Sequence, residues 1–404
     1  MKISSLRLAS VAQPVALGIM GVIAVCVLYI FKLGSLVLGV DDQELRMMEL
    51  IRSNGITLTN VLRDSTDLPY NLGMFIIQYL PFDHAGSVRI LSVCIALAAV
   101  GSMFLVLRHW HTERIAVLGS ALLAGSGWLL HLGRHGSPEI LLVLPLVLLG
   151  AYAVWSQHKR SVLAYALIGA TLACMLYTPG LTILVVLLLA WQAKSILKGL
   201  HQLPTGHTIV LLAAAALSLV PLAISLVWHA DDMAIGSYLT TLLGVPSELP
   251  SIMQYVKNLG SIGMHIALVG ERGLWPHSAS YALLDVFTTT MAIIGMFVYG
   301  QDRKLDRSKA LLVGFVVSWL IAGLGAISSA ILLPFLYLFA AEGMRYMLGQ
   351  WLSVFPRNPL AKTVGLSALS VAVCIAITFH ILGYFTVWPH QSQTKAQFTN
   401  SITD

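Results

Sequence analysis

Long apolar runs separated by short polar segments dominate this chain. The first run extends from about Pro14 to Gly39 and is interrupted only by Lys32. About 20 consecutive apolar residues are long enough to cross the hydrocarbon core of a bilayer as a helix. Of the 404 residues, 57% are hydrophobic and 10% are charged, whereas soluble domains contain about 25% charged residues. The sequence therefore predicts an all-α polytopic membrane protein and excludes a soluble globular domain.

The number of apolar runs predicts about eleven transmembrane helices in a single transmembrane domain, residues 1–404. The first run is too long for the core of a signal peptide, so we expect it to be an uncleaved span. The other ten runs lie at about 88–107, 115–133, 139–155, 161–176, 180–193, 208–228, 279–299, 310–325, 327–344 and 363–385.

The basic residues predict the orientation of these spans. An odd number of spans places the two ends of the chain on opposite sides of the membrane. The segments that share the N-terminal side hold 15 of the 24 basic residues and four of the 18 acidic ones. Cytoplasmic loops are enriched in lysine and arginine. We therefore expect a cytoplasmic N-terminus and an extracytoplasmic C-terminus.

Three polar segments lie on the predicted outer face, at 40–87, 229–278 and 388–404. The first contains the apolar stripe Leu45-Met48-Ile51, which predicts an amphipathic helix from Gln43 to Ser53 in the membrane interface. The second is long for a connection between packed spans, which is typical of functional or disordered loops. The third is a short polar tail in which we expect little fixed structure.

Two adjacent carboxylates, Asp41 and Asp42, emerge directly after the first span. Neighbouring carboxylates can hold a cation or a perturbed pKa and can act as a general base. The competing interpretation is that they cap the helix that follows, since aspartate is favoured at helix starts. The local sequence leaves both interpretations open.

A second group of ionisable residues lies in the predicted outer turn after the third span. This turn places Arg134, His135 and Glu139 within six residues, on the same face as Asp41. Ionisable groups at membrane depth are costly and tend to face a cavity or each other. Alternatively, Arg134 and His135 anchor a helix end while Glu139 complements the next helix dipole.

The order of several short motifs resembles the GT-C glycosyltransferases, and most closely their protein O-mannosyltransferase and aminoarabinose-transferase branch. The resemblance covers about residues 14–195 and is mainly topological beyond them. It rests on the acidic pair, the Arg134–Glu139 turn and the segments Leu68-Pro69-Tyr70, Tyr79-Leu80-Pro81-Phe82-Asp83 and Ser87-Val88-Arg89-Ile90-Leu91-Ser92.

This resemblance implies an enzyme of the plasma (inner) membrane that acts outside the cytoplasm. It would transfer a hexose or pentose, with inversion, from a polyprenyl-phosphate donor to a lipid, glycan or protein hydroxyl, without a nucleic-acid partner. Asp41 matches the catalytic aspartate of the family, Asp42 its acidic neighbour, and Glu139 an aspartate after the third span. An acceptor hydroxyl needs such a carboxylate, and a leaving phosphate needs fixed donors. The candidates for substrate binding are Tyr70, Arg89, Arg134, His135, Lys257, Arg272, Trp275 and His277.

Two departures from the family pattern concern phosphate binding. The turn Tyr177-Thr178-Pro179-Gly180 lacks a lysine that many relatives carry, and Ser328-Ser329-Ala330 replaces a later arginine. A relative that has lost activity is therefore an open alternative.

The metal requirement and the class of function also have alternatives. A divalent cation such as Mg²⁺ or Mn²⁺ is expected only if Asp41, Asp42 and Glu139 converge in space. Two other functions fit the composition: a transporter of lipid-linked substrates and a non-catalytic scaffold of the cell envelope. Transporters usually show inverted halves and charges near the membrane midplane, and this chain shows neither. A scaffold gives no reason for Asp41 and Glu139 to face one site.

Overall fold

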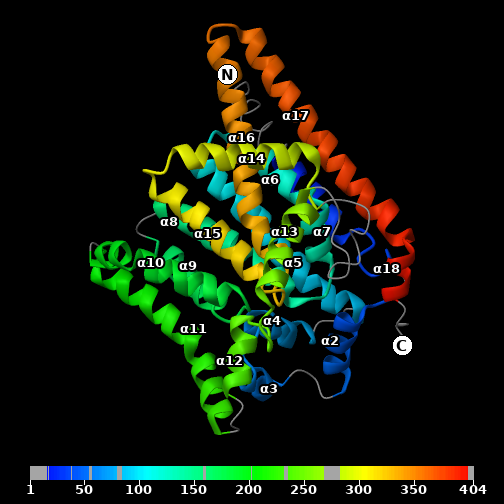
Figure 1. The fold of residues 1–404 in the computed structure, drawn as a ribbon, viewed down its shortest axis with the longest axis vertical. Helices are drawn as coiled ribbons and strands as arrows, with labels where there is room; N and C mark the ends of the chain where they lie inside the picture. The colour runs from blue at the N-terminus through cyan, green and yellow to red at the C-terminus, as the bar shows by residue number, and fades with distance from the viewer. Residues whose placement is uncertain are drawn as a thin grey trace, which may run out of the picture.

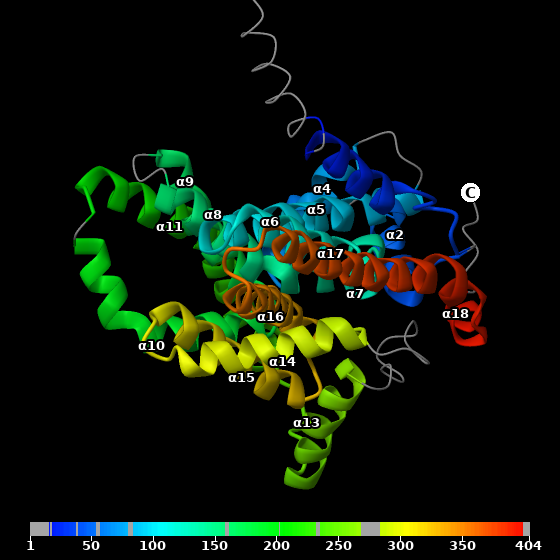
Figure 2. The same ribbon diagram turned by 90° about the horizontal axis from the view of Figure 1, so that it is seen from above.

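The computed structural model describes residues 16, 18–37, 39–53, 57–79, 84–157, 161–201, 203–231, 235–267 and 283–398. Within these residues the chain is built from helices and short connections, and no β-strand occurs (Figures 1 and 2). The predicted all-α class is confirmed.

The apolar runs of the sequence correspond to helices along the whole described chain. The first helix is Gly18–Ile30. It is followed by α2 (Asp42–Ser53), α3 (Leu58–Arg63), α4 (Leu68–Ile77), α5 (His84–Trp110), α6 (Glu113–Ala124), α7 (Gly127–Arg134), the 3-10 helix η1 (Pro138–Val143), α8 (Leu144–Gln157), α9 (Val162–Met175), α10 (Leu181–His201), α11 (Thr205–Asp231), α12 (Ile235–Leu243), α13 (Ile252–Ala267), α14 (Val286–Gln301), α15 (Asp306–Gly323), the 3-10 helix η2 (Ser329–Leu332), α16 (Leu333–Val354) and α17 (Pro359–Leu382).

Fewer of these helices than predicted have the properties of complete membrane spans. Among the described residues, six helices are long and apolar enough to cross a bilayer, or seven if the bent pair α6 and α7 is one span. Several other predicted spans, among them Gly18–Ile30 and Val162–Met175, form shorter apolar helices. The helical nature of the runs is confirmed, whereas the predicted number of eleven spans is not.

The centre of the molecule is made by α5, which packs against α6, α7 and α8, and by the tightly packed pair α14 and α16. Small residues allow this pair to approach closely. A Cβ atom at Gly295 would lie 1.8 Å from the Phe339 carbonyl oxygen, and one at Gly343 would lie 2.0 Å from that of Met291. Any larger residue at either position would force the two helices apart.

A break between α6 and α7 directs the chain toward the predicted outer turn. The two helices meet at 58°. The helix α6 ends at Ala124 with Gly125 as its C-cap, and Ser126 starts α7, because its hydroxyl oxygen accepts a hydrogen bond from the Leu129 N–H at 3.1 Å. This is the usual role of a serine at a helix start. The bend places Arg134 at the end of α7 and His135 directly after it.

The C-terminal segment is folded over residues 383–398, contrary to the expectation of a tail with little structure. It continues α17 as a short π-helix, η3 (Gly383–Val387), then as η4 (Trp388–His390) and α18 (Ser392–Gln397). Trp388, Thr394 and Phe398 are buried. Figure 1 shows α18 on the same side of the molecule as α2. Aromatic burial explains why a segment rich in polar residues is ordered.

Candidate active site

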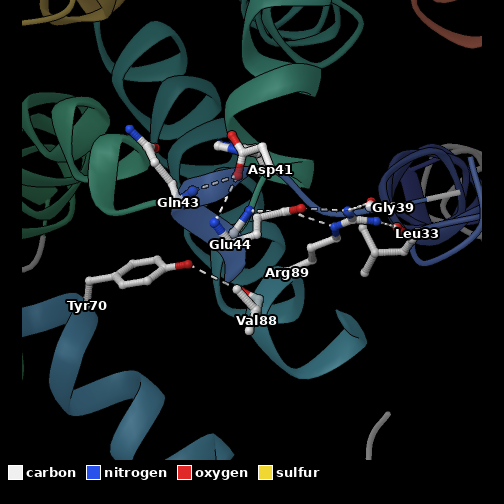
Figure 3. A network of polar contacts seen from close by, with 10 residues as sticks. Leu33, Gly39, Asp41, Gln43, Glu44, Tyr70, Val88 and Arg89 are labelled. Carbon is white, nitrogen blue, oxygen red and sulfur yellow. Dashed lines mark hydrogen bonds and ion pairs between the residues drawn. The ribbon is translucent and has the colours of Figure 1, made fainter. Parts of the chain in front are cut away.

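Asp41 connects the first helix to α2 and uses its two carboxylate oxygens differently. Oδ1 accepts hydrogen bonds from the backbone N–H groups of Gln43 at 3.1 Å and Glu44 at 2.8 Å, which caps α2 (Figure 3). Oδ2 lies 2.9 Å from Nε2 of His135. Oδ1 therefore caps the helix, whereas Oδ2 faces the other ionisable residues, so the two interpretations of Asp41 apply to different atoms of one side chain.

His135 and Asp41 shift each other's pKa toward the charged forms. Burial by itself raises the pKa of Asp41, but the hydrogen bond and charge of His135 and the two backbone N–H groups outweigh it and lower this pKa to about 2. Burial likewise lowers the pKa of His135, and its hydrogen bond to Asp41 together with the charges of Glu44, Asp41 and Glu139 raises it above the ordinary value. Both shifts favour the charged forms, an ionised carboxylate beside an imidazolium.

Glu44 forms a second ion pair beside the first. Its oxygens accept hydrogen bonds from Nε and Nη2 of Arg89, each at 2.7 Å, and its Oε1 also accepts the N–H of Gly136 at 2.9 Å. Arg89 donates further to the carbonyl oxygens of Leu33 and Gly39 (Figure 3). Burial is the largest single effect and raises the pKa of Glu44, but the hydrogen bond and charge of Arg89, the charge of His135 and the Gly136 N–H together outweigh it and lower this pKa. Both side chains are buried, and the pair ties α2 to α5.

Glu44 was not predicted as a site residue, although the sequence carries a signal for it. Positions 41, 44, 45 and 48 lie on one face of a helix. That face carries Asp41 and the apolar residues Leu45 and Met48. A glutamate on the apolar face of a predicted helix indicates a buried charge that needs a partner.

Arg134 has a structural role in place of the predicted binding of phosphate. Its Nη1 donates to the carbonyl oxygens of Leu28 and Tyr29, and its Nη2 donates to those of Phe31 and Lys32, at 2.8–3.2 Å. These carbonyl groups lie at and just beyond the C-terminal end of the first helix, where the helix dipole attracts a cation. Because Nη1 and Nη2 of Arg134 already donate to these carbonyl oxygens, they are not available to bind a phosphate.

Two other predicted binding residues also serve the fold. The Tyr70 hydroxyl is fully buried, donates to the Val88 carbonyl oxygen at 3.2 Å and lies 3.2 Å from the Ser92 hydroxyl. Arg89 is committed to Glu44. Neither side chain is available to a substrate, so both are corrected to positioning residues that hold α4, α5 and α2 together.

The remaining predicted residues are not brought into this group. Asp42 is exposed on the first turn of α2, and Lys257 is exposed on α13. Arg272, Trp275 and His277 lie outside the described residues. Glu139 begins η1 and is half-buried, and its charge contributes to the raised pKa of His135. The structure thus brings Asp41 and His135 into contact, and the charge of Glu139 acts on the same imidazole.

Asp67 adds another carboxyl group near Glu139. It has a left-handed backbone, with φ of 53°, and its N–H donates to the Tyr177 carbonyl oxygen at 2.8 Å. Non-glycine residues in this conformation often mark functional sites. Burial, followed by the charges of Asp64 and Glu139, raises the pKa of Asp67 to about 7. An acid that can exchange protons near neutral pH thus lies against the Tyr177 turn.

Aromatic residues from the C-terminal segment cover one side of His135. The Phe398 ring meets the His135 ring edge-on at 6.5 Å, and Trp388 meets His131 at 5.7 Å. His131 in turn stacks on His135 at 5.2 Å. The cavity behind these rings is about 10 Å³, which is room for one water molecule at most. This cavity is therefore too small to hold a sugar.

The described residues contain one group that could hold a metal ion: Asp41, Glu44 and His135, with ligand atoms within 4.8 Å of one another. Of the predicted metal ligands Asp41, Asp42 and Glu139, only Asp41 belongs to this group. However, Arg89 already donates to both oxygens of Glu44, and His135 faces Asp41. Two positive and two negative side chains balance within the group. A divalent cation does not fit this charge-balanced arrangement.

Comparisons with known proteins leave the family open. No protein-family model and no curated protein matches the chain. Among solved structures, it is similar to an oligosaccharyltransferase of Archaeoglobus fulgidus that was crystallised with a tethered acceptor peptide containing the NVT sequon. The TM-score is 0.49 with 13% identity, over 95% of this chain and 55% of that one. This distant similarity assigns no activity to the chain.

Proposed function

We propose that the protein is a membrane glycosyltransferase of the GT-C type. It transfers a sugar from a polyprenyl-phosphate donor to a hydroxyl group at the extracytoplasmic face. The observation that carries this proposal is the contact between Asp41 and His135, 94 positions apart, at 2.9 Å beside Glu139. A scaffold has no need for this convergence of ionisable groups. The sequence resemblance supports the same function, since Asp41 matches the family's catalytic aspartate.

In the proposed reaction the acceptor oxygen attacks the anomeric carbon from the face opposite the leaving phosphate. A C–O bond to the acceptor forms, the C–O bond to the phosphate breaks, and the configuration inverts. Asp41 accepts the hydroxyl proton. A carboxylate with a pKa of about 2 is a weak base toward a free alcohol. It suffices here because the attacking hydroxyl becomes strongly acidic once its oxygen bonds to the sugar carbon.

His135 supplies positive charge at the same place. Its imidazolium is kept protonated by the surrounding carboxylates, and it can stabilise the negative charge that develops on the leaving phosphate. The departing group is the polyprenyl phosphate, whose chain stays in the membrane. Asp67, with a pKa of about 7, is the second carboxyl group suited to proton transfer.

Asp41→Asn tests the proposal directly. Asparagine keeps the cap of α2 but removes the base, so transfer should fall by about 10²- to 10⁴-fold. The purified variants are incubated separately with a panel of polyprenyl-phosphate sugars and cell-envelope extract, and donor consumption is followed by mass spectrometry. The matched control is Glu49→Gln, an exposed acid of the same helix. Wild-type turnover by Asp41→Asn would refute the role of Asp41. Intact donors with all folded proteins would refute the activity.

A further inference from the structure

A second cluster of charged groups lies at the opposite end of α5 from the candidate active site. Arg89 is near the start of α5, and Trp110 is its last residue. These two positions are 21 residues apart, or about 30 Å at 1.5 Å per residue, which is the thickness of the hydrocarbon core. The second cluster therefore lies at the other membrane face, which the basic residues predict to be cytoplasmic.

A buried glutamate forms the centre of this second cluster. Glu342 of α16 is 2% exposed and accepts hydrogen bonds from Nε and Nη2 of Arg345 on the same oxygen, Oε1. Its other oxygen, Oε2, lies 3.4 Å from Nε2 of His111. The Arg345 side chain is 43% exposed. This guanidinium thus connects the buried acid to the surface.

Arg307 provides a second guanidinium with a different environment. Its Cζ lies 5.2 Å from the centre of the Trp110 ring and 5.9 Å from that of Tyr299. In the described part of the chain, no carboxylate forms an ion pair with it. The neighbouring Asp306 is 3.6 Å from Lys309 instead. Two aromatic rings therefore hold a half-buried cation in place without neutralising it.

Two buried side chains near these arginines lack hydrogen-bond partners. Neither nitrogen of His111 makes a hydrogen bond, and neither does the Tyr299 hydroxyl, although both side chains are almost fully buried. Burial, and then the charges of Arg307 and Arg345, lower the pKa of His111 to about 4. The neutral ring still has one N–H to donate. Unsatisfied buried donors cost stability, so they need an acceptor.

The excess of basic residues around these donors indicates that the acceptor is an anion. Segment 302–309 and the pair Glu342 and Arg345 together contain five basic and three acidic residues. An added anion would meet two guanidinium groups, a phenol O–H and an imidazole N–H. It would also lie near the Glu342 carboxylate, which Arg345 already pairs through Oε1 and whose Oε2 lies 3.4 Å from His111 without a hydrogen bond. Phosphate oxygens suit these donor groups, because arginine binds phosphate through several parallel hydrogen bonds.

We propose that Arg307, Arg345, His111 and Tyr299 form a binding site for a phosphate group at the end of α5 opposite the active site. The supporting observations are independent of the glycosyltransferase proposal. Two sources offer this chemistry, namely the headgroup of an anionic phospholipid in the adjacent leaflet and a free phosphate in solution. Clusters of basic residues at the cytoplasmic surface attract anionic lipids by charge, but here the orphaned donors also require a specific acceptor.

The test compares Arg307→Gln with Arg303→Gln in the full-length protein. Arg303 lies in the same segment, is exposed, and donates only to the Gly300 carbonyl oxygen. Delipidated protein is titrated with phosphatidylglycerol or phosphatidylcholine, and bound lipid is measured by native mass spectrometry. In a second arm, thermal unfolding is followed with and without inorganic phosphate. Near-UV circular dichroism and size-exclusion chromatography establish that each variant is folded.

The wild type and Arg303→Gln should bind one phosphatidylglycerol in preference to phosphatidylcholine, and Arg307→Gln should bind it about fivefold more weakly. That result supports a lipid source. Stabilisation by inorganic phosphate in the wild type and Arg303→Gln but not in Arg307→Gln, without selective lipid binding, supports a free phosphate. Arg307→Lys should retain part of either effect, because it keeps the charge but not the planar donor pair. Equal behaviour of Arg307→Gln and Arg303→Gln in both arms would overturn the proposal.

Discussion

Each end of α5 carries a cluster that contains a glutamate, an arginine and a histidine. The pKa of the histidine is shifted in opposite directions in the two clusters. At one end Glu44 pairs with Arg89, and His135 lies among carboxylates. At the other end Glu342 pairs with Arg345, and His111 lies between arginines. The pKa of His135 is raised, whereas that of His111 is lowered to about 4. Both rings are buried, so the sign of the neighbouring charges decides which histidine is charged.

The clusters also differ in their access to water. Glu44 and Arg89 are both buried, at 1% and 5% exposure of their side chains, whereas Arg345 is 43% exposed. A closed ion pair provides rigidity, and an open one leaves a cation that can bind a ligand. The buried pair of Arg89 and Glu44 therefore holds helices in position, whereas the exposed Arg345 guanidinium can bind a ligand.

The largest expected effect is the loss of stability when the closed pair is broken. Glu44→Gln leaves Arg89 buried without a counter-charge and should cost about 3–5 kcal/mol. Glu342→Gln should cost less, because Arg345 can turn to water. Thermal and denaturant unfolding in detergent micelles measure both, with Glu49→Gln as the control on α2. Equal losses in the two variants would show that exposure of the arginine does not set the cost.

The next effect concerns pH, and its sign differs between the two histidines. The Asp41–His135 pair stabilises the fold while the acid is ionised and the ring is protonated. Because the pKa of Asp41 is lowered to about 2 and that of His135 is raised, this stabilisation is lost as the pH falls through about 2. It is also lost as the pH rises through the raised pKa of His135.

His111 acts in the opposite direction. Its folded-state pKa of about 4 lies below the ordinary 6.5, so the unfolded state binds more protons and stability decreases as the pH falls from 6.5 toward 4. His135→Gln should therefore destabilise most below neutrality, and His111→Gln should relieve the loss between pH 6 and 4. Unfolding curves across this pH range measure both. Parallel pH profiles for the two variants would contradict the assigned charges.

A smaller effect is expected from opening the aromatic cover of His135. Phe398→Ala removes the ring that meets this imidazole edge-on at 6.5 Å, so at a pH above the raised pKa of His135, where the ring is neutral, the rate of its carbethoxylation by diethyl pyrocarbonate should rise severalfold. His111, at the other end of α5, should react at an unchanged rate and serves as the internal control. Peptide mass spectrometry follows both sites. An unchanged rate at His135 would show that Phe398 does not shield it.

The smallest effect should follow metal removal. Because Arg89 and His135 already balance Asp41 and Glu44, chelation by EDTA should leave sugar transfer unchanged. The measurement is donor consumption before and after dialysis against the chelator. Loss of turnover that Mg²⁺ or Mn²⁺ restores would show that a cation displaces His135 from Asp41 and that the charge argument is wrong.

Local patterns in the sequence were sufficient for the helices and for part of the site. Apolar runs predicted the helices because helix hydrogen bonds are local and the pattern needs no distant partner. Asp41 was predicted both as a helix cap and as a site residue, and His135 was predicted as its neighbour on one face. The folded C-terminal segment was missed because its order comes from contacts of Trp388 and Phe398 with α7 and the turn after it.

The sequence by itself determined that this chain is a helical membrane protein with an acidic helix start after its first helix. Tertiary structure alone decided which charges meet. Glu44 and Arg89 are 45 positions apart, and Arg134 reaches carbonyl groups more than 100 positions away. Helix propensity and hydrophobicity depend on nearby residues, whereas the partner of a buried charge depends on how distant helices pack. For this reason Arg134 and Arg89 were predicted to bind substrate, although the fold uses them to hold its first helix and α2 in place.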